Sequence, residues 1–308
     1  MGFQRLSAFG GSSAKPRPYL ARPLGLIRPN LNDVTLCCID CAQPHLALRA
    51  MRLSLDQCDF AAALLLTDAA LADAPVTGPV IAVRRIAPLA DARAYSAFML
   101  KGLAAHIETD FALVVQWDGH VIDGARWESG FRGFDYIGAP WPRARPGEQV
   151  GNGGFSLRSR RLLAVLAGDA FPAGHPEDVR IGATWRPALE RLGMRFPPPE
   201  TARRFAVEME IDPAPSFGFH GLYNFWRCVP VDGLAVLLDM LPASQARGWQ
   251  MQDLLLRYAT LRRWAEAALV RARIEREIGS AGLLAALSAF LGTAQAAAIL
   301  AAVGARGR

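Results

Sequence analysis

Lysine is almost absent from this chain of 308 residues, in which Lys15 and Lys101 are the only two. The formal net charge of +6 is therefore carried almost wholly by arginine. A basic balance favours anionic partners such as phosphates, nucleotide diphosphates, anionic lipid surfaces or nucleic acid. Nucleic acid is the weakest of these, because the arginines are scattered and the sequence lacks zinc-finger spacing, a basic zipper and an aromatic RNA-binding signature. We expect no nucleic-acid partner.

Two glycine motifs that bind nucleotides are also missing. No G-x-G-x-x-G lies at the first strand–helix junction, and no Gly-Lys-Ser/Thr follows a glycine-rich turn. These absences argue against a Rossmann dehydrogenase and a P-loop kinase. A nucleotidyltransferase could share a similar sheet, but the chain has no glycine-rich, basic first loop for a triphosphate.

The five cysteines do not form a recognisable framework. Cys38 and Cys41 make a C-x-x-C pattern, which is typical of redox and metal sites. However, Cys37 and Cys38 lie in the apolar run Val34–Ile39, where free cysteine behaves as a small core hydrophobe. No second C-x-x-C completes a zinc site. The odd count, and the lack of an apolar core after the first arginine, favour a reducing compartment, and we expect a cytoplasmic protein.

The middle of the chain alternates short apolar runs with helical patterns. Residues 1–32 lack periodicity and predict a flexible basic arm. Strands are expected at Val34–Ile39, Phe60–Leu66, Pro79–Ile86 and Phe111–Gln116, and helices at Pro44–Gln57 and Asp91–Ile107. This alternation predicts an α/β domain over residues 33–230, with a mainly parallel sheet flanked by helices. Ligands of such sheets bind outside the carboxyl ends of the strands, where the polar residues Asp40, Thr67, Asp68 and Asp118 fall.

Residues 231–308 predict a helical C-terminal extension, with one long helix at Trp249–Ile278. The segment Gly279–Ala305 contains no charged residue and is long enough to span a bilayer. Its many alanines favour two short packed helices that are broken at Gly292. The alternative is a helix that contacts the inner face of a membrane, or a second copy of the chain.

Asp118 follows a predicted buried strand at the point where the chain leaves the sheet. With His120 two residues on, it offers oxygen and nitrogen ligands to a divalent cation. Asp-Gly is also a common turn dipeptide, so both interpretations stay open. His220, between Phe219 and Gly221, suits a metal or a diphosphate oxygen as a neutral imidazole, although a lone histidine is more often structural.

A glycine-dense turn at Asn152, Gly153 and Gly154 leads into an apolar run. Bare glycines let backbone N–H groups approach a ligand closely; the alternative is a tight turn that needs positive φ. Glu177 and Asp178 begin a predicted helix, where carboxylates are favoured by the helix dipole. In the functional interpretation Asp178, or else Glu177, accepts the proton of an acceptor hydroxyl.

Five motifs occur in order: Gln116-Trp117-Asp118-Gly119, Tyr136-Ile137-Gly138-Ala139-Pro140-Trp141, Gly151–Ser159, Pro176-Glu177-Asp178-Val179 and Phe217–Gly221. Together they resemble an uncharacterised bacterial family of glycosyltransferase-like domains and, more distantly, the GT-A fold glycosyltransferases. The resemblance covers about Val34 to Trp226. It implies a GT-A-like, Rossmann-like fold, a nucleotide-sugar donor with a UDP-sugar as first choice, and a glycan or lipid-linked acceptor.

The resemblance also implies roles for single residues. Asp118 falls where GT-A enzymes carry an Asp-x-Asp motif that binds a divalent cation, Mn²⁺ or Mg²⁺, and the donor diphosphate; His120 stands at its second acidic position. His220 resembles a late histidine that completes the metal site. Lys101 resembles a lysine that touches the donor, with a solvated helix face as its alternative. Asp178 resembles the base of inverting members. The donor-binding set is then Asp40, Thr67, Asp68, Lys101, Asp118, Asn152, Gly153 and Gly154.

The sequence thus predicts a glycosyltransferase that moves a sugar from a nucleotide-diphosphate sugar to a hydroxyl of a glycan or envelope acceptor. The reaction would be metal-assisted and inverting, with retention as the alternative outcome. The rival function is a non-catalytic scaffold that binds a glycan or a nucleotide sugar with the same fold.

Overall fold

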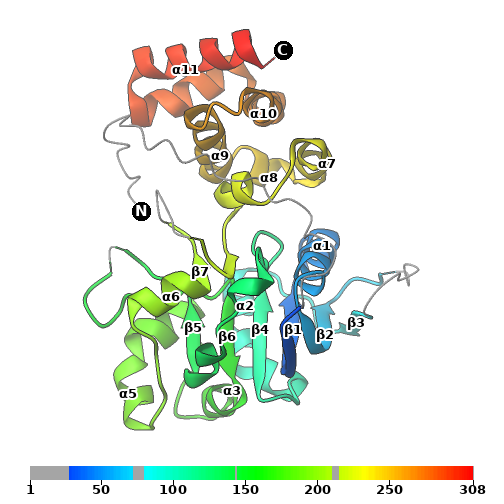
Figure 1. Ribbon diagram of the computed structural model, residues 1–308, viewed down its shortest axis with the longest axis vertical. Coiled ribbons are helices and arrows are strands. Elements are labelled where there is room, and N and C mark those ends of the chain that lie inside the picture. The colour runs from blue at the N-terminus through cyan, green and yellow to red at the C-terminus, as the bar shows by residue number, and fades with distance from the viewer. Residues whose placement is uncertain (1–27, 72–79, 143, 210–214, 308) are drawn as a thin grey trace. The chain divides into compact units, whose positions relative to one another are not determined.

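A computed structural model describes residues 28–71, 80–142, 144–209 and 215–307. These residues divide into two compact units, one ending at Gly221 and one beginning at Leu222 (Figure 1). Most of the predicted N-terminal arm, residues 1–27, lies outside the described residues.

The first unit is built on a six-stranded sheet in the order β3-β2-β1-β4-β6-β5. Its strands are β1 (Asn30–Ile39), β2 (Asp59–Thr67), β3 (Ala82–Arg85), β4 (Phe111–Val115), β5 (Tyr136–Gly138) and β6 (Ser156–Ser159). The pairs β1–β2, β1–β4 and β2–β3 are parallel, whereas β6 runs antiparallel to both β4 and β5. The predicted fold class, a mainly parallel sheet flanked by helices and followed by a helical extension, is confirmed.

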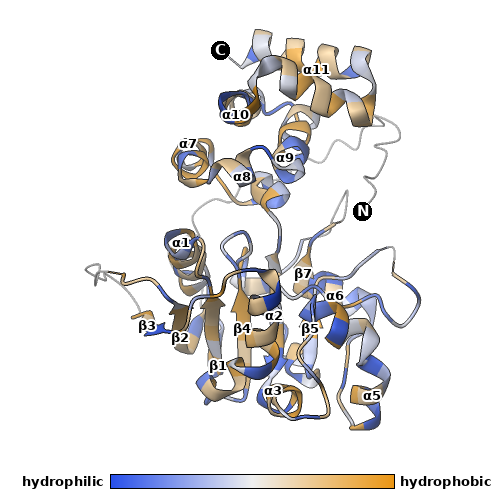
Figure 2. Cartoon of the chain, turned by 180° about the vertical axis from the view of Figure 1, so that it is seen from behind, coloured by the Kyte–Doolittle hydropathy of each residue, from blue (hydrophilic) through white to orange (hydrophobic). Residues whose placement is uncertain are grey.

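Alternate residues of the strands pack on opposite faces of the sheet. Leu36 and Cys38 of β1 face a core with α1 (Pro44–Leu55), whereas Cys37 and Ile39 face a core with α2 (Ala92–Lys101) and α3 (Arg160–Ala167). Both faces are apolar because helices cover both, and Figure 2 colours these strands hydrophobic. The neighbouring cysteines Cys37 and Cys38 are fully buried on opposite faces, Cys41 of the C-x-x-C pattern is partly buried, and all five cysteines are free.

Shorter elements complete the first unit. They are the single-turn helices η1 (Leu103–His106), η2 (Gly124–Arg126) and η3 (Ser129–Gly133), the continuous helical stretch α4 (Glu177–Val179), η4 (Arg180–Thr184) and α5 (Arg186–Arg191), then α6 (Pro199–Phe205) and the parallel pair β7 (Ala206–Val207) and β8 (Gly218–Phe219).

Several predicted boundaries shift in the structure. The first strand begins at Asn30 rather than Val34, and the second helix starts after its cap Asp91, whose carboxylate accepts the N–H groups of Arg93 and Ala94. That helix ends before Gly102 instead of reaching Ile107. Strand β6 was not predicted, because four residues are too few to show a strand period, and all four are buried although Ser156 and Arg158 are polar.

The second unit is helical, as predicted, but its long helix is divided. After η5 (Leu222–Arg227) come α7 (Val231–Met240), α8 (Ala243–Ala246), α9 (Trp249–Thr260), α10 (Trp264–Leu291) and α11 (Thr293–Arg306). The predicted helix Trp249–Ile278 is wrong, because the chain turns between α9 and α10, where Arg262 adopts a φ of 57°.

The predicted break at Gly292 is confirmed, since this residue has a φ of 81° and separates α10 from α11. Gly279, at the start of the charge-free segment, also interrupts α10 with a φ of 69°. Within the described residues, none of the helices has the length and apolarity needed to cross a membrane.

Candidate functional site

The carboxyl ends of β1, β2 and β4 lie level at one edge of the sheet. Cys38 pairs with Leu65 on one side and with Val115 on the other. The polar residues that follow these strands therefore lie side by side, as the sequence predicts: Asp40 after β1, Thr67 and Asp68 at the end of β2, and Gln116 to Asp118 after β4.

At this edge, Asp40 and Thr67 are engaged in local turns. Oδ1 of Asp40 accepts the N–H groups of Ala42 and Gln43, at 2.8 and 2.5 Å, and so holds the start of α1. Burial raises the pKa of Asp40, and the nearby Asp118 adds to this effect. Thr67 is completely buried, and its Oγ1 accepts the N–H of Ala69 at 3.2 Å. Their roles in binding a donor stay predictions.

The glycine segment reaches the same edge because β6 is antiparallel to β4. Ser156 at the start of β6 pairs with Val114 near the end of β4, so the residues just before β6 lie beside the end of β4. Asn152 organises this turn: its Oδ1 accepts the N–H groups of Gly154 and Phe155, at 3.1 and 3.3 Å.

Gly153 and Gly154 are required for close packing. A Cβ on Gly154 would lie 2.1 Å from Nε2 of His220, because the imidazole ring packs directly on this residue. A Cβ on Gly153 would lie 3.0 Å from the side chains of Glu177 and Asp178. Neither glycine has positive φ, so the tight-turn alternative is wrong, and both serve to bring side chains of the site together.

His220 is held between carboxylates from two other segments. Its Nδ1 lies 3.0 Å from Oε1 of Glu208, and its Nε2 lies 3.0 Å from Oε1 of Gln116 and 3.5 Å from Oδ1 of Asp118. Burial disfavours the imidazolium, but Asp118 and Glu208 outweigh it and raise the pKa of His220 well above its usual range. This shift favours the imidazolium form, in which both ring N–H groups can donate to these oxygens.

Glu208 is a site residue that sequence reasoning missed. It follows β7 as His220 follows β8, and the two strands are paired in parallel with Val207 opposite Phe219. The Nδ2 group of Asn152 also donates to Oε1 of Glu208, at 2.8 Å. Strands of two residues leave no periodic signal in a sequence, so this pairing was not predictable.

Of the three predicted metal ligands, Asp118 and His220 lie within 3.5 Å of each other, whereas His120 makes its contacts elsewhere. His120 is buried: its Nδ1–H donates to the carbonyl of Val121 at 2.8 Å, and its ring packs edge-on against Phe219. Burial lowers the pKa of His120 to about 4, so the ring is neutral. In the part of the chain that the structure describes, no group of three His, Cys, Asp or Glu side chains could hold a metal ion. Asp118, His120 and His220 therefore do not fit a cation held by protein ligands alone.

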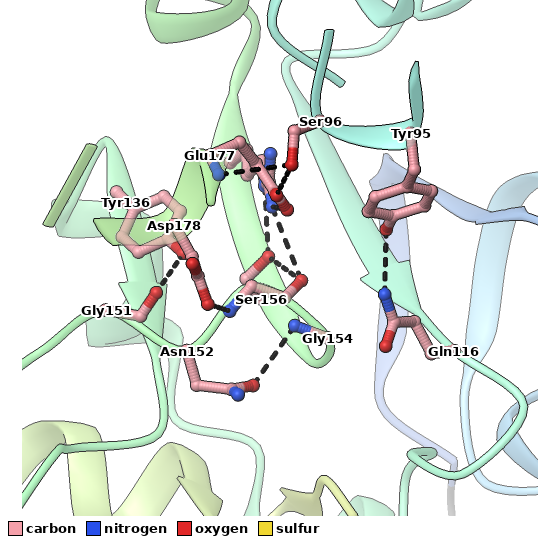
Figure 3. Close-up of polar contacts among 12 residues, drawn as sticks. Tyr95, Ser96, Gln116, Tyr136, Gly151, Asn152, Gly154, Ser156, Glu177 and Asp178 are labelled. Carbon is pink, nitrogen blue, oxygen red and sulfur yellow. Dashed lines mark hydrogen bonds and ion pairs between the residues drawn. The ribbon is translucent and has the colours of Figure 1, made fainter. Parts of the chain in front are cut away.

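Asp178 is half-buried and lies beside the glycine turn. Its Oδ2 accepts the N–H of Gly153 at 3.3 Å (Figure 3). Its Oδ1 accepts the N–H of Val179 at 2.8 Å. Burial, with the negative charges of Glu177 and Glu208, raises the pKa of Asp178 to about 6. A partly accessible carboxylate with this pKa has the properties of a general base.

Glu177 points away from solvent into a buried polar network. Ser96 of α2 donates its hydroxyl to Oε2 of Glu177 at 2.8 Å and accepts the backbone N–H of Glu177 at 3.3 Å (Figure 3). Nδ1 of His175 lies 2.9 Å from the same hydroxyl, and because the serine hydrogen is already given to Glu177, the histidine is the donor. Glu177 is thus less accessible to a substrate than Asp178.

Arg158, also missed by sequence reasoning, is the centre of this network. It is completely buried, with Nη2 3.6 Å from Oε1 of Glu177 and 3.3 Å from the carbonyl oxygen of Gly153. Its Nε donates to Oγ of Ser156 at 3.0 Å, and its guanidinium lies 5.4 Å from the ring centroid of Tyr136. Arg158 compensates the buried charge of Glu177, which lies next to Asp178.

Lys101 does not lie at this edge of the sheet. Its ammonium group donates to the carbonyl oxygens of Leu166 and Gly168, at 2.9 and 2.7 Å, at the end of α3. It is the last residue of α2, which leads into β4, so it lies toward the amino ends of the parallel strands. The structure does not bring it to the site, and its predicted role in binding a donor is not supported.

One family model matches the middle of the chain. This model, described as "Protein of unknown function (DUF5672)", matches residues 80–220. The predicted resemblance to a family of unknown function is confirmed over this range, which is shorter than Val34 to Trp226. No curated protein matches the chain.

Among solved structures, the chain is similar to a mannosyltransferase from Pyrobaculum calidifontis, determined in complex with GDP-mannose and Mn²⁺. The match covers 94% of this chain and 90% of that chain, with 14% sequence identity and a TM-score of 0.40. At that level of similarity, the ligands of the mannosyltransferase do not define those of this chain.

Proposed function

We propose that this protein is a glycosyltransferase that moves a sugar from a nucleotide-diphosphate sugar to an acceptor hydroxyl. The observation that carries the proposal is Asp178, a half-buried carboxylate with a pKa of about 6 beside a crowded polar edge of the sheet. Its position supports proton removal from a hydroxyl, and the edge itself is where ligands of parallel sheets bind.

In the proposed reaction the acceptor oxygen attacks the anomeric carbon of the donor while Asp178 takes the hydroxyl proton. The bond from that carbon to the diphosphate oxygen breaks, and the nucleoside diphosphate leaves with the electron pair. A base on the side opposite the leaving group gives inversion. At pH 7 a carboxyl with a pKa of about 6 is mostly ionised yet more basic than an ordinary aspartate.

Other residues of the site support the proposed transfer by holding Asp178 in place and by balancing charge. Arg158 pairs with Glu177, so that the residue next to the base does not carry an uncompensated charge. Asn152 and the glycines hold the turn whose N–H contacts Asp178. In its protonated form, His220 offsets the negative charges of Asp118 and Glu208 at the edge at which the diphosphate of a donor would lie.

The donor is tested first by thermal unfolding with a panel of nucleoside diphosphates and nucleotide sugars, with UDP-sugars among them. A ligand that binds only the folded chain at a hundredfold excess over its Kd adds about 2.7 kcal/mol of stability. We expect one nucleotide series to raise the melting temperature, and Asp118→Asn to reduce that shift. If no nucleotide shifts the wild type, the glycosyltransferase proposal fails and a glycan-binding scaffold takes its place.

The finer assignments stay predictions: a UDP-sugar donor, a glycan or lipid-linked acceptor, Mn²⁺ or Mg²⁺ as a cofactor, and a contact of the C-terminal helices with a membrane or a second copy.

A further inference from the structure

Trp141 lies at the same edge of the sheet and packs on backbone. It follows β5, whose last residue Gly138 pairs with Ser156 at the start of β6. A Cβ on Gly151 would lie 2.2 to 2.8 Å from three carbon atoms of the indole six-membered ring. Glycine at 151 therefore allows the ring to press against the main chain.

This environment differs from that of five other tryptophan rings. The five contact an aromatic ring or an arginine side chain: Trp127, Trp185, Trp226, Trp249 and Trp264. Trp141 instead lies against Gly151 and, more loosely, Gly182, at which a Cβ would be 3.5 Å from the ring. Its side chain is half-buried, and its indole N–H is not among the buried polar atoms that lack a partner.

The ring and the proposed base contact the same glycine segment. Gly182 packs on Gly151, since a Cβ on Gly182 would lie 2.9 Å from the Cα of Gly151. Asp178 is one helical turn before Gly182 in the continuous stretch α4–η4, and it accepts the N–H of Gly153. Figure 3 shows Gly151 on the same side of the network as Asp178. The indole of Trp141 thus packs on Gly151, and the carboxylate of Asp178 accepts a hydrogen bond from Gly153, two residues further along the same segment.

We propose that Trp141 forms a stacking surface for the sugar ring that carries the acceptor hydroxyl. The inference rests on the proposed function, because it places the acceptor beside Asp178. A pyranose presents C–H groups on its faces and hydroxyls at its rim, and a half-exposed indole offers an apolar face with an N–H donor at its edge. An anionic acceptor would gain little from such a surface, whereas the C–H face and hydroxyl rim of a pyranose match both of its parts, so the proposed acceptor class is a carbohydrate.

Saturation-transfer NMR tests this surface without turnover. The probes are the methyl pyranosides of glucose, galactose and mannose, added to the full chain in the presence of the nucleoside diphosphate that binds. We expect signal at the ring C–H protons of at least one probe with wild type and with Asp178→Asn. Trp141→Ala should abolish it, and Trp141→Phe should keep most of it. If Trp141→Ala is unstable, the comparison is made with Trp141→His.

The results separate this inference from the proposed function. Trp141-dependent binding without any transfer supports the sugar surface and overturns the transferase. If transfer occurs, Trp141→Ala should raise the acceptor KM about three- to tenfold and leave the donor KM unchanged. Transfer with an unchanged acceptor KM overturns the sugar surface alone, and so does the absence of pyranoside binding to the wild type.

Discussion

Nη2 of Arg158 lies 3.6 Å from Oε1 of Glu177, and the two side chains are 0% and 7% exposed. A buried ion pair of this kind contributes little net stability, because both charges lose their hydration, but removal of one partner leaves the other uncompensated. Since Glu177 precedes Asp178 in the chain, the pair also fixes the backbone that presents the proposed base.

Arg158→Met and Glu177→Gln should each destabilise the fold by about 3–5 kcal/mol, because each leaves a buried group without its partner. The double variant should cost less than the sum of the two. Urea unfolding of the four proteins gives the coupling free energy as a double-mutant cycle.

The exposed pair formed by Arg204 and Glu128 serves as the control. Its Nε–Oε1 distance is 2.7 Å, and the side chains are 51% and 43% exposed. Glu128→Gln should cost less than about 1 kcal/mol. If single variants at Arg158 or Glu177 are as stable as this control, the two side chains do not form the buried ion pair described above.

The pKa of Asp178, raised to about 6, should control the dependence of turnover on pH. The base must be ionised, so kcat/KM should fall about tenfold per pH unit below pH 6 and level off above it. Initial rates from pH 4.5 to 8 measure this profile, and a flat profile through pH 6 would exclude Asp178 as the base.

Stability gives an independent check of the same pKa. The pKa of Asp178 is about 6 in the folded chain, whereas its ordinary value is 3.8. Between about pH 4 and pH 6 the unfolded chain therefore ionises this carboxyl while the folded chain keeps it protonated, so the free energy of unfolding falls as the pH rises through this range. Asp178→Asn should therefore be more stable than the wild type above pH 6, and this gain should disappear below about pH 4.

Gly154→Ala should disturb the site, because the new methyl group would lie 2.1 Å from Nε2 of His220. The imidazole has to move away from Gln116 and Glu208. We expect a loss of about 1–3 kcal/mol in stability and weaker donor binding. Gly130→Ala is the matched control, because nothing lies within 4 Å of its Cβ position. Equal behaviour of the two variants would show that His220 is not held as described.

Mn²⁺ alone should bind weakly, because the described residues offer no group of three metal ligands. Binding should tighten with a nucleoside diphosphate, whose phosphate oxygens supply further ligands. Calorimetric titration of Mn²⁺ with and without the nucleotide measures the difference. Tight binding to the protein alone would show that a complete ligand set exists.

The sequence predicted those parts of the fold that follow from periodicity. The apolar runs around Cys38, Leu65 and Val115 identified the parallel strands, and the residues after them fell at one edge as expected. Gly292 was recognised as a break because glycine readily adopts positive φ. Asp118, Asn152, Gly153, Gly154, Asp178 and His220, which the motifs singled out, lie near one another in the structure, and their functional roles stay predictions.

What the sequence could not predict depends on contacts between distant segments. Arg158 is buried only because Glu177, Ser156 and Gly153 accept its hydrogen bonds or compensate its charge. Glu208 joins His220 through the pairing of two very short strands. Lys101 looked like a phosphate ligand on its helix, but the direction of α2 takes it to the carbonyl groups that end α3.

The central claim, that Asp178 acts as the base in sugar transfer, is tested most directly by turnover of the nucleotide sugar that the binding panel identifies. Product formation with a carbohydrate acceptor is measured for the wild type and for Asp178→Asn, with donor affinity recorded for both. We expect Asp178→Asn to bind the donor as the wild type does and to transfer about 10²–10⁴-fold more slowly. Equal transfer by the two proteins would contradict the claim.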